Sequence, residues 1–163
     1  MDNRTRPAPP GVLAKKKTLI AAERDPWARA LFALQQTTLD ATHLVVLDSE
    51  AELDGATALV AAPTTALAGN AIWVGAVQQI TAALPTADWL WLDGTAVTGW
   101  GGVEPNDRDR QENREEQFAR IEKGKLYLQD SAGSGNDSAL CECDGKPISQ
   151  AAAAAITDNR PAS

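Results

Sequence analysis

Short apolar runs, separated by polar and turn-forming segments, follow one another along the sequence from residue 18 to residue 143. Runs of this length that contain β-branched or aromatic residues are typical of strands. They occupy residues 18–22, 43–47, 71–75, 88–92, 117–121, 125–128 and 139–143. We therefore predict short strands at these places.

Helix signals occur in the first half of this region. Asp25 and Pro26 combine an N-cap with a proline at the first helical position, and apolar residues follow at helical spacing, which predicts a helix over residues 26–36. Ser49 and Glu52 have the spacing of a capping box, which predicts a second helix ending near Pro63. Helices followed by runs of short strands indicate an α+β domain.

The two ends of the chain lack this pattern. Residues 1–16 mix charged residues with prolines and a glycine, so we predict a flexible tail or linker there. We assign residues 17–144 to a single domain, which is long enough to bury a core. Residues 145–163 are predicted to be a C-terminal tail, in which the alanines favour a short helix that offers little to bury.

A long segment between residues 94 and 116 is rich in Gly, Pro, Asp, Asn and Arg. Loops of this length inside a compact domain are usually functional or disordered. The sequence Glu104-Pro105-Asn106 places two oxygen-bearing side chains around a proline within this loop, and the strand ahead of it carries Trp89 and Trp91. We predict that these two tryptophans pack in the core.

Charge and hydropathy exclude two classes of partner. The net charge of −7 argues against nucleic acid, because nucleic-acid binding needs clustered Lys and Arg. No run of 18 apolar residues is present, so we expect no membrane span, and the first thirty residues lack the apolar stretch of a signal peptide. We do not expect an enzyme, since no nucleophile stands near a recognisable base and the single histidine, His43, is interpreted as structural.

Cys141 and Cys143 are two positions apart, which is too close for an unstrained disulfide. We interpret them as small core residues.

The order of several motifs resembles that of C-type lectin-like domains over about 125 residues, from the first predicted strand to Cys143. The motifs are Trp27, HLVVLDSEAE, IWVG, WLWLDGT, Trp100, EPN, Gln129-Asp130 and Cys141-Glu142. The resemblance implies an α+β, C-type lectin-like fold, with two helices flanking short antiparallel sheets and a long irregular loop. It also implies a cis peptide bond between Glu104 and Pro105.

The same resemblance implies a Ca²⁺ site whose residues also bind sugar. Carboxylate and amide oxygens are the ligands that Ca²⁺ prefers. The implied metal and sugar-binding residues are Glu104, Asn106, Glu115, Gln129 and Asp130, with Glu112 as the alternative to Glu115. In the family, EPN accompanies mannose-type sugars. Because these carboxylates have reference pKa values near 4, binding is expected to fade as the pH falls toward about 5.

The sequence differs from the family in five ways. The family's disulfide partners for Cys141 and for the inner pair are missing, Gln129 stands in place of Asn, and LYLQD lacks a tryptophan. The loop carries Arg108, Arg110 and Arg114, which could pair with the predicted calcium ligands. Asp107 and Glu116 resemble ligands of an auxiliary calcium position, but Gln78 and Thr81 stand where its other carboxylates are needed, so we expect one ion at most.

Two functions therefore remain open. The first is a calcium-dependent carbohydrate-binding module for terminal mannose-type sugars, used in adhesion outside the cell or on its surface, where weak sites gain from repetition on an oligomer. The alternative is a calcium-independent protein-interaction or assembly subunit with a protein partner. The alanine-rich composition favours a bacterial source.

Overall fold

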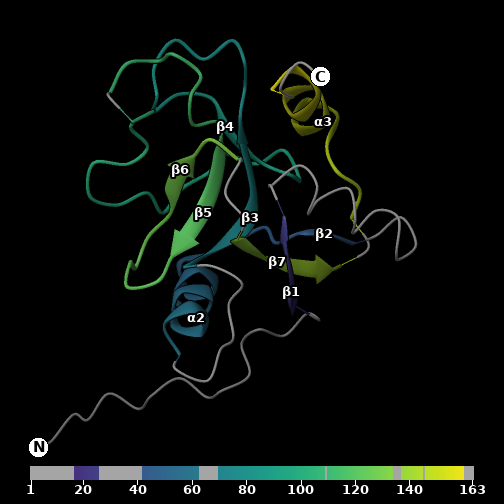
Figure 1. Ribbon diagram of the computed structural model, residues 1–163. Helices are drawn as coiled ribbons and strands as arrows, with labels where there is room; N and C mark the ends of the chain where they lie inside the picture. The colour runs from purple at the N-terminus through teal and green to yellow at the C-terminus, as the bar shows by residue number, and fades with distance from the viewer. Residues whose placement is uncertain are drawn as a thin grey trace, which may run out of the picture.

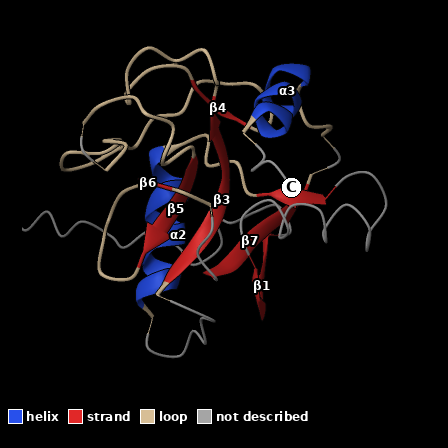
Figure 2. Cartoon of the chain, turned by 45° about the horizontal axis from the view of Figure 1, so that its top comes forward, coloured by secondary structure: helices blue, strands red, loops and turns tan. Residues whose placement is uncertain are grey.

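The computed structural model describes residues 17–25, 42–62, 70–108, 110–133, 137–144 and 146–159, and all structural statements below concern these residues. They form one sheet of short strands with two helices and long loops (Figures 1 and 2). The elements are β1 (Lys17–Asp25), β2 (Thr42–Leu44), α2 (Glu50–Ala61), β3 (Ala71–Gln78), β4 (Trp89–Trp91), β5 (Phe118–Glu122), β6 (Gln129–Ser131), β7 (Asp137–Cys143) and α3 (Gln150–Asp158).

The sheet has the strand order β1-β7-β3-β5-β6, with β2 paired to β7 and β4 paired to β3. The pairing of β3 with β7 is parallel, and the other pairings are antiparallel. Strands β3 and β7 each pair with three other strands, so segments from the whole described chain meet on these two strands. The predicted α+β class is confirmed.

Strand β3 is buried along its whole length. Its residues are mostly apolar without alternation, as expected for a strand covered on both faces. Helix α3 contacts this strand, and α2 contacts β5 beside it. In Figure 1 the two helices lie at opposite ends of the sheet. The largest fully buried side chains include Trp73, Ile72, Trp91, Leu92, Ile121 and Leu140.

Gly75 lets another backbone segment cross closely over β3. Its N–H donates to the carbonyl of Val45 at 2.8 Å, and the Val45 N–H donates to the carbonyl of Leu140 in β7 at 2.8 Å. A Cβ atom on Gly75 would lie 2.5 Å from the carbonyl oxygen of Leu44 and would also meet the side chain of Leu92. Only glycine fits here, because the first of these obstacles is backbone.

Most of the predicted elements are confirmed. Strands are present at six of the predicted places, as β1, β2, β3, β4, β5 and β7. The predicted N-cap is also present, since the Ser49 hydroxyl accepts from the Glu52 N–H. The Glu52 carboxylate accepts from the N–H of Asp48, one residue before the N–H of Ser49 that a capping box uses. The helix predicted over residues 26–36 lies outside the described residues.

The strand predicted over residues 125–128 is wrong. Residues 123–127 form turns and bends, Leu126 is 75% exposed, and β6 begins only at Gln129. Leu128 makes an isolated bridge with Trp100. Leu126 faces solvent, Tyr127 lies against Gly101 and Gly102 of the long loop, and only Leu128 is buried in the core, so the run does not form a strand.

The helix favoured by the C-terminal alanines is present as α3. The expectation that it has little to bury is wrong, because Ala152, Ala155 and Ile156 are buried. Small residues on one face allow the helix backbone to approach the sheet. The segment is also fixed by polar contacts at both ends, since Ser149 N–H donates to Leu92 O at 2.7 Å and the Asn159 side chain donates to Gln78 O at 2.7 Å. The division of the chain into tail, domain and tail stays a prediction.

The predictions of core residues are confirmed where the side chains are described. Trp89 and Trp91 are buried, and so is Cys141, which is a free cysteine. The side chain of Cys143 lies outside the described residues. No described helix has the length and apolar content needed to cross a membrane.

Gly75→Ala is expected to destabilise the fold by about 2 to 4 kcal/mol, because a methyl group there must displace backbone. Urea denaturation monitored by tryptophan fluorescence measures this loss. Gly124→Ala is the matched control. Gly124 has a φ of +86° and open space around its Cβ position, so only the conformational cost of about 1 kcal/mol is expected. Equal losses at the two positions would contradict the proposed backbone clash.

Candidate functional site

A single buried carboxylate shapes the long loop. Asp107 is fully buried, and each of its oxygens accepts two backbone N–H groups from further along the loop. The donors are Asn113 at 2.6 Å, Arg114 at 2.9 Å, Glu115 at 2.8 Å and Glu116 at 2.7 Å. In sequence, Asp107 resembles a ligand of an auxiliary calcium position. In the structure, both of its carboxylate oxygens accept backbone hydrogen bonds from the loop instead.

The same segment has an unusual backbone conformation. Asp107, Arg108, Arg110 and Arg114 have φ values between 47° and 68°, in the left-handed region that non-glycine residues adopt rarely. The hydrogen bonds to Asp107 favour this conformation over an extended one. The loop is therefore irregular but held in place.

The base of the loop is held by Gln78, the last residue of β3. Its fully buried amide nitrogen lies within 3.2 Å of four oxygens, which are Leu84 O, Pro85 O, Ala87 O and Glu112 Oε2. Its amide oxygen accepts from Gln117 at 3.0 Å. Glu112, the alternative calcium ligand, therefore faces two glutamine amides rather than Glu104.

Three of the predicted site residues are brought together. The Glu104-Pro105 bond is cis, as predicted. Beyond it, the Asn106 side chain donates to Glu104 Oε2, and the Asn106 N–H donates to Asp130 Oδ2 at 2.9 Å. Asp107 N–H donates to the same oxygen at 2.6 Å. Asp130 is fixed by strand β6, where it pairs with Ala119 of β5.

Burial and the charge of Asp130 raise the pKa values of two carboxylates here, Glu104 and Glu116. Burial raises the pKa of Glu104 to about 8, helped by the hydrogen bond that its protonated form donates to Asp130 and by repulsion from the Asp130 charge. The pKa of Glu116 is raised as well, first by burial and then by the charge of Asp130. Glu104, Glu116 and Asp130 thus form one electrostatic group.

Two neighbouring buried oxygens lack a hydrogen-bond donor when the carboxylates are ionised. They are Asp130 Oδ1, which belongs to this group, and Oε1 of Gln129, the preceding residue of β6. Leaving a buried acceptor without a partner costs about 1 to 3 kcal/mol. Oxygen donors with nothing to accept fit a hard cation such as Ca²⁺. The three carboxylates do not converge within 4.8 Å of one another, so binding an ion requires side-chain rotations that bring them closer.

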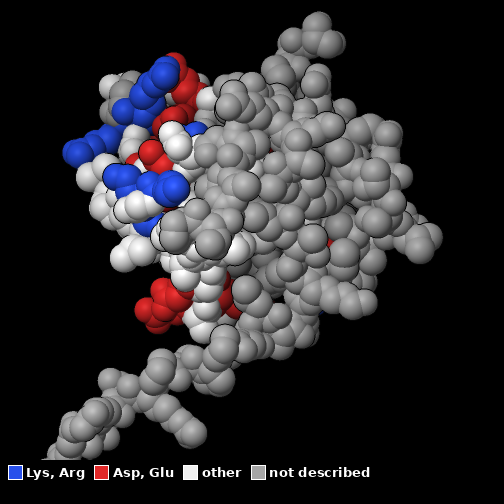
Figure 3. Space-filling view, turned by 60° about the horizontal axis from the view of Figure 1, so that its bottom comes forward, with Lys and Arg blue, Asp and Glu red and all other residues white. Residues whose placement is uncertain are grey.

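Glu115, the predicted loop ligand, lies apart from this group. Its side chain is 48% exposed and pairs with Arg108 at 3.5 Å. Arg108 is itself 75% exposed, so the pair is weak. On the face drawn in Figure 3, basic side chains lie beside acidic ones. The sequence did not assign Glu116 to this group. Glu115 and Glu116 are chemically identical neighbours, and only the conformation of the loop backbone decides which side chain approaches the site.

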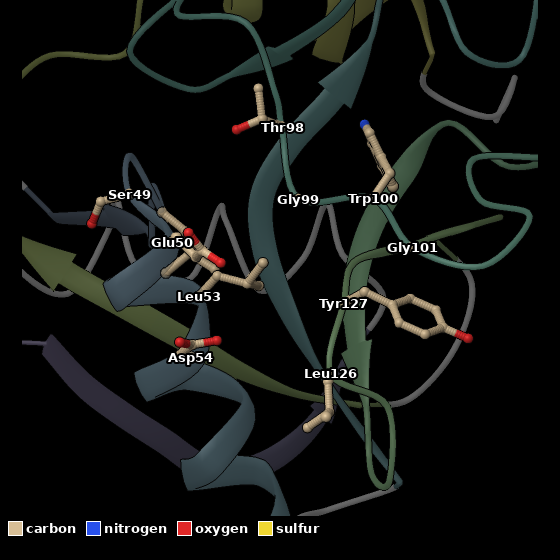
Figure 4. Close-up of a pocket in the computed structure, with 11 residues that line it drawn as sticks. Ser49, Glu50, Leu53, Asp54, Thr98, Gly99, Trp100, Gly101, Leu126 and Tyr127 are labelled. Carbon is tan, nitrogen blue, oxygen red and sulfur yellow. The ribbon is translucent and has the colours of Figure 1, made fainter. Parts of the chain in front are cut away.

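A separate groove of about 490 Å³ lies between α2 and the start of the loop (Figure 4). Ser49, Glu50, Leu53 and Asp54 line it from α2, and residues 98–101 face them. The exposed Leu126 and the half-buried Tyr127 complete its wall. The groove therefore combines apolar surface with two carboxylates at one rim.

Similar solved structures are C-type lectin domains. The lectin CEL-I from Cucumaria echinata has 17% sequence identity and a TM-score of 0.61, over 80% of this chain and 90% of that chain. CEL-IV has 21% identity and a TM-score of 0.60, over 88% and 97%. The C-type lectin domain of murine dendritic cell inhibitory receptor 2, in complex with N-glycan, has 18% identity and a TM-score of 0.57, over 78% and 90%.

The chain has a C-type lectin fold. The resemblance drawn from the order of its motifs is thus confirmed at the level of the fold. No protein-family model and no curated protein matches the sequence. This C-type lectin fold is stabilised without the disulfides expected from the resemblance, since Cys141 is free and no other cysteine precedes it.

Stability of the calcium-free lectin fold is expected to fall as the pH rises from about 5 to 8. The folded chain keeps a proton on Glu104 up to a pKa of about 8, whereas the unfolded chain loses it near 4.5. The folded state binds more protons in this window, so raising the pH favours unfolding. Thermal melts in a calcium chelator across this range measure the slope. Glu104→Gln should flatten it, and an unchanged slope would contradict the assignment.

Proposed function

We propose that this lectin fold binds one Ca²⁺ ion through Glu104, Asn106 and Asp130, assisted by Gln129 and a loop glutamate. The proposal is carried by this partly buried group, in which Asp130 is buried, Glu104 and Glu116 are half-buried, and carboxylate oxygens outnumber the donors that face them. A cation would provide the partner that Asp130 Oδ1 and Gln129 Oε1 lack. It would also offset the burial and the repulsion from Asp130 that raise the pKa of Glu104.

We propose that the ligand of this site is a terminal mannose-type sugar. A bound Ca²⁺ ion supplies coordination positions that two neighbouring hydroxyls can occupy in place of water. Glu104 and Asn106 would accept from and donate to the same hydroxyls, because their side chains carry the matching groups. The murine receptor domain in complex with N-glycan supports a glycan as the general class of ligand. Sites of this kind fill with calcium outside the cell, where its concentration is high enough.

Glu116 is the better candidate for the loop glutamate. Burial and then the charge of Asp130 raise its pKa, so Glu116 lies within the electrostatic influence of the site, whereas the side chain of Glu115 is 48% exposed and pairs with Arg108. For Glu115 to bind the ion, its side chain would have to leave Arg108 and turn inward. The two residues differ by one position, which gives a matched pair of variants.

Glu116→Gln is expected to weaken calcium binding at least about tenfold, because it removes a charged ligand, while Glu115→Gln leaves it nearly unchanged. Calorimetry with Ca²⁺, followed by mannose with and without chelator, measures both steps. Asn106→Ala should abolish mannose binding. If Glu115→Gln has the larger effect, Glu115 is the ligand, and if Asn106→Ala binds mannose as well as the parent, the site assignment fails.

Calcium binding is expected to release about one proton near pH 7, because Glu104 must give up its proton to bind the ion. The affinity should fall about tenfold per pH unit below about pH 8, rather than only near pH 5 as the reference pKa values predicted. Calorimetry in two buffers of different ionisation enthalpy counts the protons. Affinity that is constant from pH 6 to 8 would contradict this role of Glu104.

A calcium-independent protein-interaction function is the second candidate. It is favoured by the groove beside α2, where Leu126 is 75% exposed and Glu50 and Asp54 line the wall. The exposed Val103 adds apolar surface on the long loop. Binding to a protein partner that persists in chelator and is lost in Leu126→Asp would favour this function over glycan binding.

A further inference from the structure

Strand pairing brings three metal-ligating side chains to one place outside the long loop. In the antiparallel pairing of β2 with β7, His43 lies opposite Glu142. Asp144 follows Glu142 by two positions, so it extends from the same face of the chain. The register of two strands that are far apart in sequence thus groups one imidazole with two carboxylates.

All three side chains are almost completely buried. The exposed fractions of the side chains are 4% for His43, 7% for Glu142 and 6% for Asp144. One ligand atom from each residue lies within 4.8 Å of the other two. His43 Nε2 is 3.2 Å from Asp144 Oδ1, and His43 Nδ1 is 3.8 Å from Glu142 Oε1. Among the described residues, no other set of three His, Cys, Asp or Glu side chains is this compact.

The hydrogen bonds around His43 leave Nε2 facing an acceptor. Nδ1 lies 2.8 Å from the carbonyl oxygen of Leu44, and a carbonyl can only accept, so Nδ1 carries a proton. In the neutral ring the lone pair of Nε2 then points at the carboxylate of Asp144. Two electron-pair donors that face each other at 3.2 Å suit a cation that contacts both of them. A histidine whose Nδ1–H is held by a backbone carbonyl is oriented as metal-ligating histidines are.

The carboxylates are also held in position. Glu142 Oε1 accepts the Val46 N–H at 2.9 Å, and Asp144 Oδ1 accepts the Lys146 N–H at 2.9 Å. The Lys146 ammonium group lies 3.4 Å from Asp144 Oδ2, but its side chain is half-exposed and can turn into solvent when another cation binds. Glu142 and Asp144 each accept at least one hydrogen bond, and because a carboxylate has about four lone-pair sites, both can still bind a metal.

We propose that His43, Glu142 and Asp144 form a site for a divalent transition-metal ion of the Zn²⁺ class. One nitrogen and two carboxylate ligands match the donor sets of zinc, whereas Ca²⁺ binds oxygen. The ion would connect β2 to the C-terminal end of β7, across 101 positions of sequence between His43 and Asp144. It would therefore act as a structural cross-link in a fold that lacks the expected disulfides. This site is independent of the calcium site, and either can exist without the other.

The test is a Zn²⁺ titration of the untagged full-length chain with Ca²⁺ present, followed by calorimetry. We expect one Zn²⁺ per chain and a higher melting temperature in its presence. His43→Gln should weaken binding at least about 100-fold, and Asp144→Asn should weaken it too. Glu104→Gln is the control and should bind Zn²⁺ like the parent. Zinc bound equally well by His43→Gln, or not bound by the parent chain, would overturn the site.

Two spectroscopic measurements keep the test decisive if a variant fails to fold. His43 is the only histidine, so its ring nitrogens can be observed by ¹⁵N NMR in the unmodified sequence. Zn²⁺ should shift the Nε2 resonance while Nδ1 stays protonated. Co²⁺ should give an absorption spectrum without a sulfur-to-metal charge-transfer band. If Zn²⁺ does not shift the Nε2 resonance, no metal binds between His43 and Asp144, and the proposal fails. If Co²⁺ gives a sulfur-to-metal charge-transfer band, the metal binds to cysteine instead.

Discussion

The burial of strand β3 along its whole length is the constraint on which the rest of the fold depends. A strand covered on both faces needs neighbours on both edges, and β7, β4 and β5 provide them through parallel and antiparallel pairing. Gly75 is part of this constraint, because its lack of a side chain lets residues 44 and 45 cross the strand. The crossing joins β7 to β3 through Val45, so the first and last described strands are tied to the centre.

The long loop depends on polar contacts in the way that the sheet depends on apolar ones. It has no regular backbone hydrogen bonding, so side chains must bind its N–H groups. Asp107 binds four of them, Asp130 binds two, and Gln78 draws the carbonyls of residues 84, 85 and 87 to the base of the loop. A rigid irregular loop results, which can present Glu104 and Asn106 in a fixed relation to Asp130.

The two proposed ion sites differ in how the fold builds them. The acidic group of Glu104, Glu116 and Asp130 is assembled mainly by the loop, and its excess of acceptors makes the protonated or cation-bound forms favourable. The group of His43, Glu142 and Asp144 is assembled by strand register at the other side of the sheet's central strands. The pKa of Asp144 illustrates the contrast. Burial raises it, but hydrogen bonds from Lys146 and the neighbouring His43 outweigh burial and lower it overall.

The sequence by itself determined the local features. The apolar runs placed β3, β4 and β7, the Ser49–Glu52 spacing placed the start of α2, and the order of the motifs indicated the C-type lectin fold and the cis bond before Pro105. The local elements depend on residues that are close together in the sequence. The fold could be recognised because the order of the motifs is kept even where the rest of the sequence differs from the family. The tertiary structure decided what depends on contacts between distant segments. It left Glu115 half-exposed beside Arg108, brought Glu116 within the electrostatic influence of Asp130, used Asp107 and Glu112 to hold the loop, and packed α3 on the sheet. It also set His43 opposite Glu142, a pairing across nearly 100 residues that no local pattern records, because register is fixed by the packing of the whole sheet.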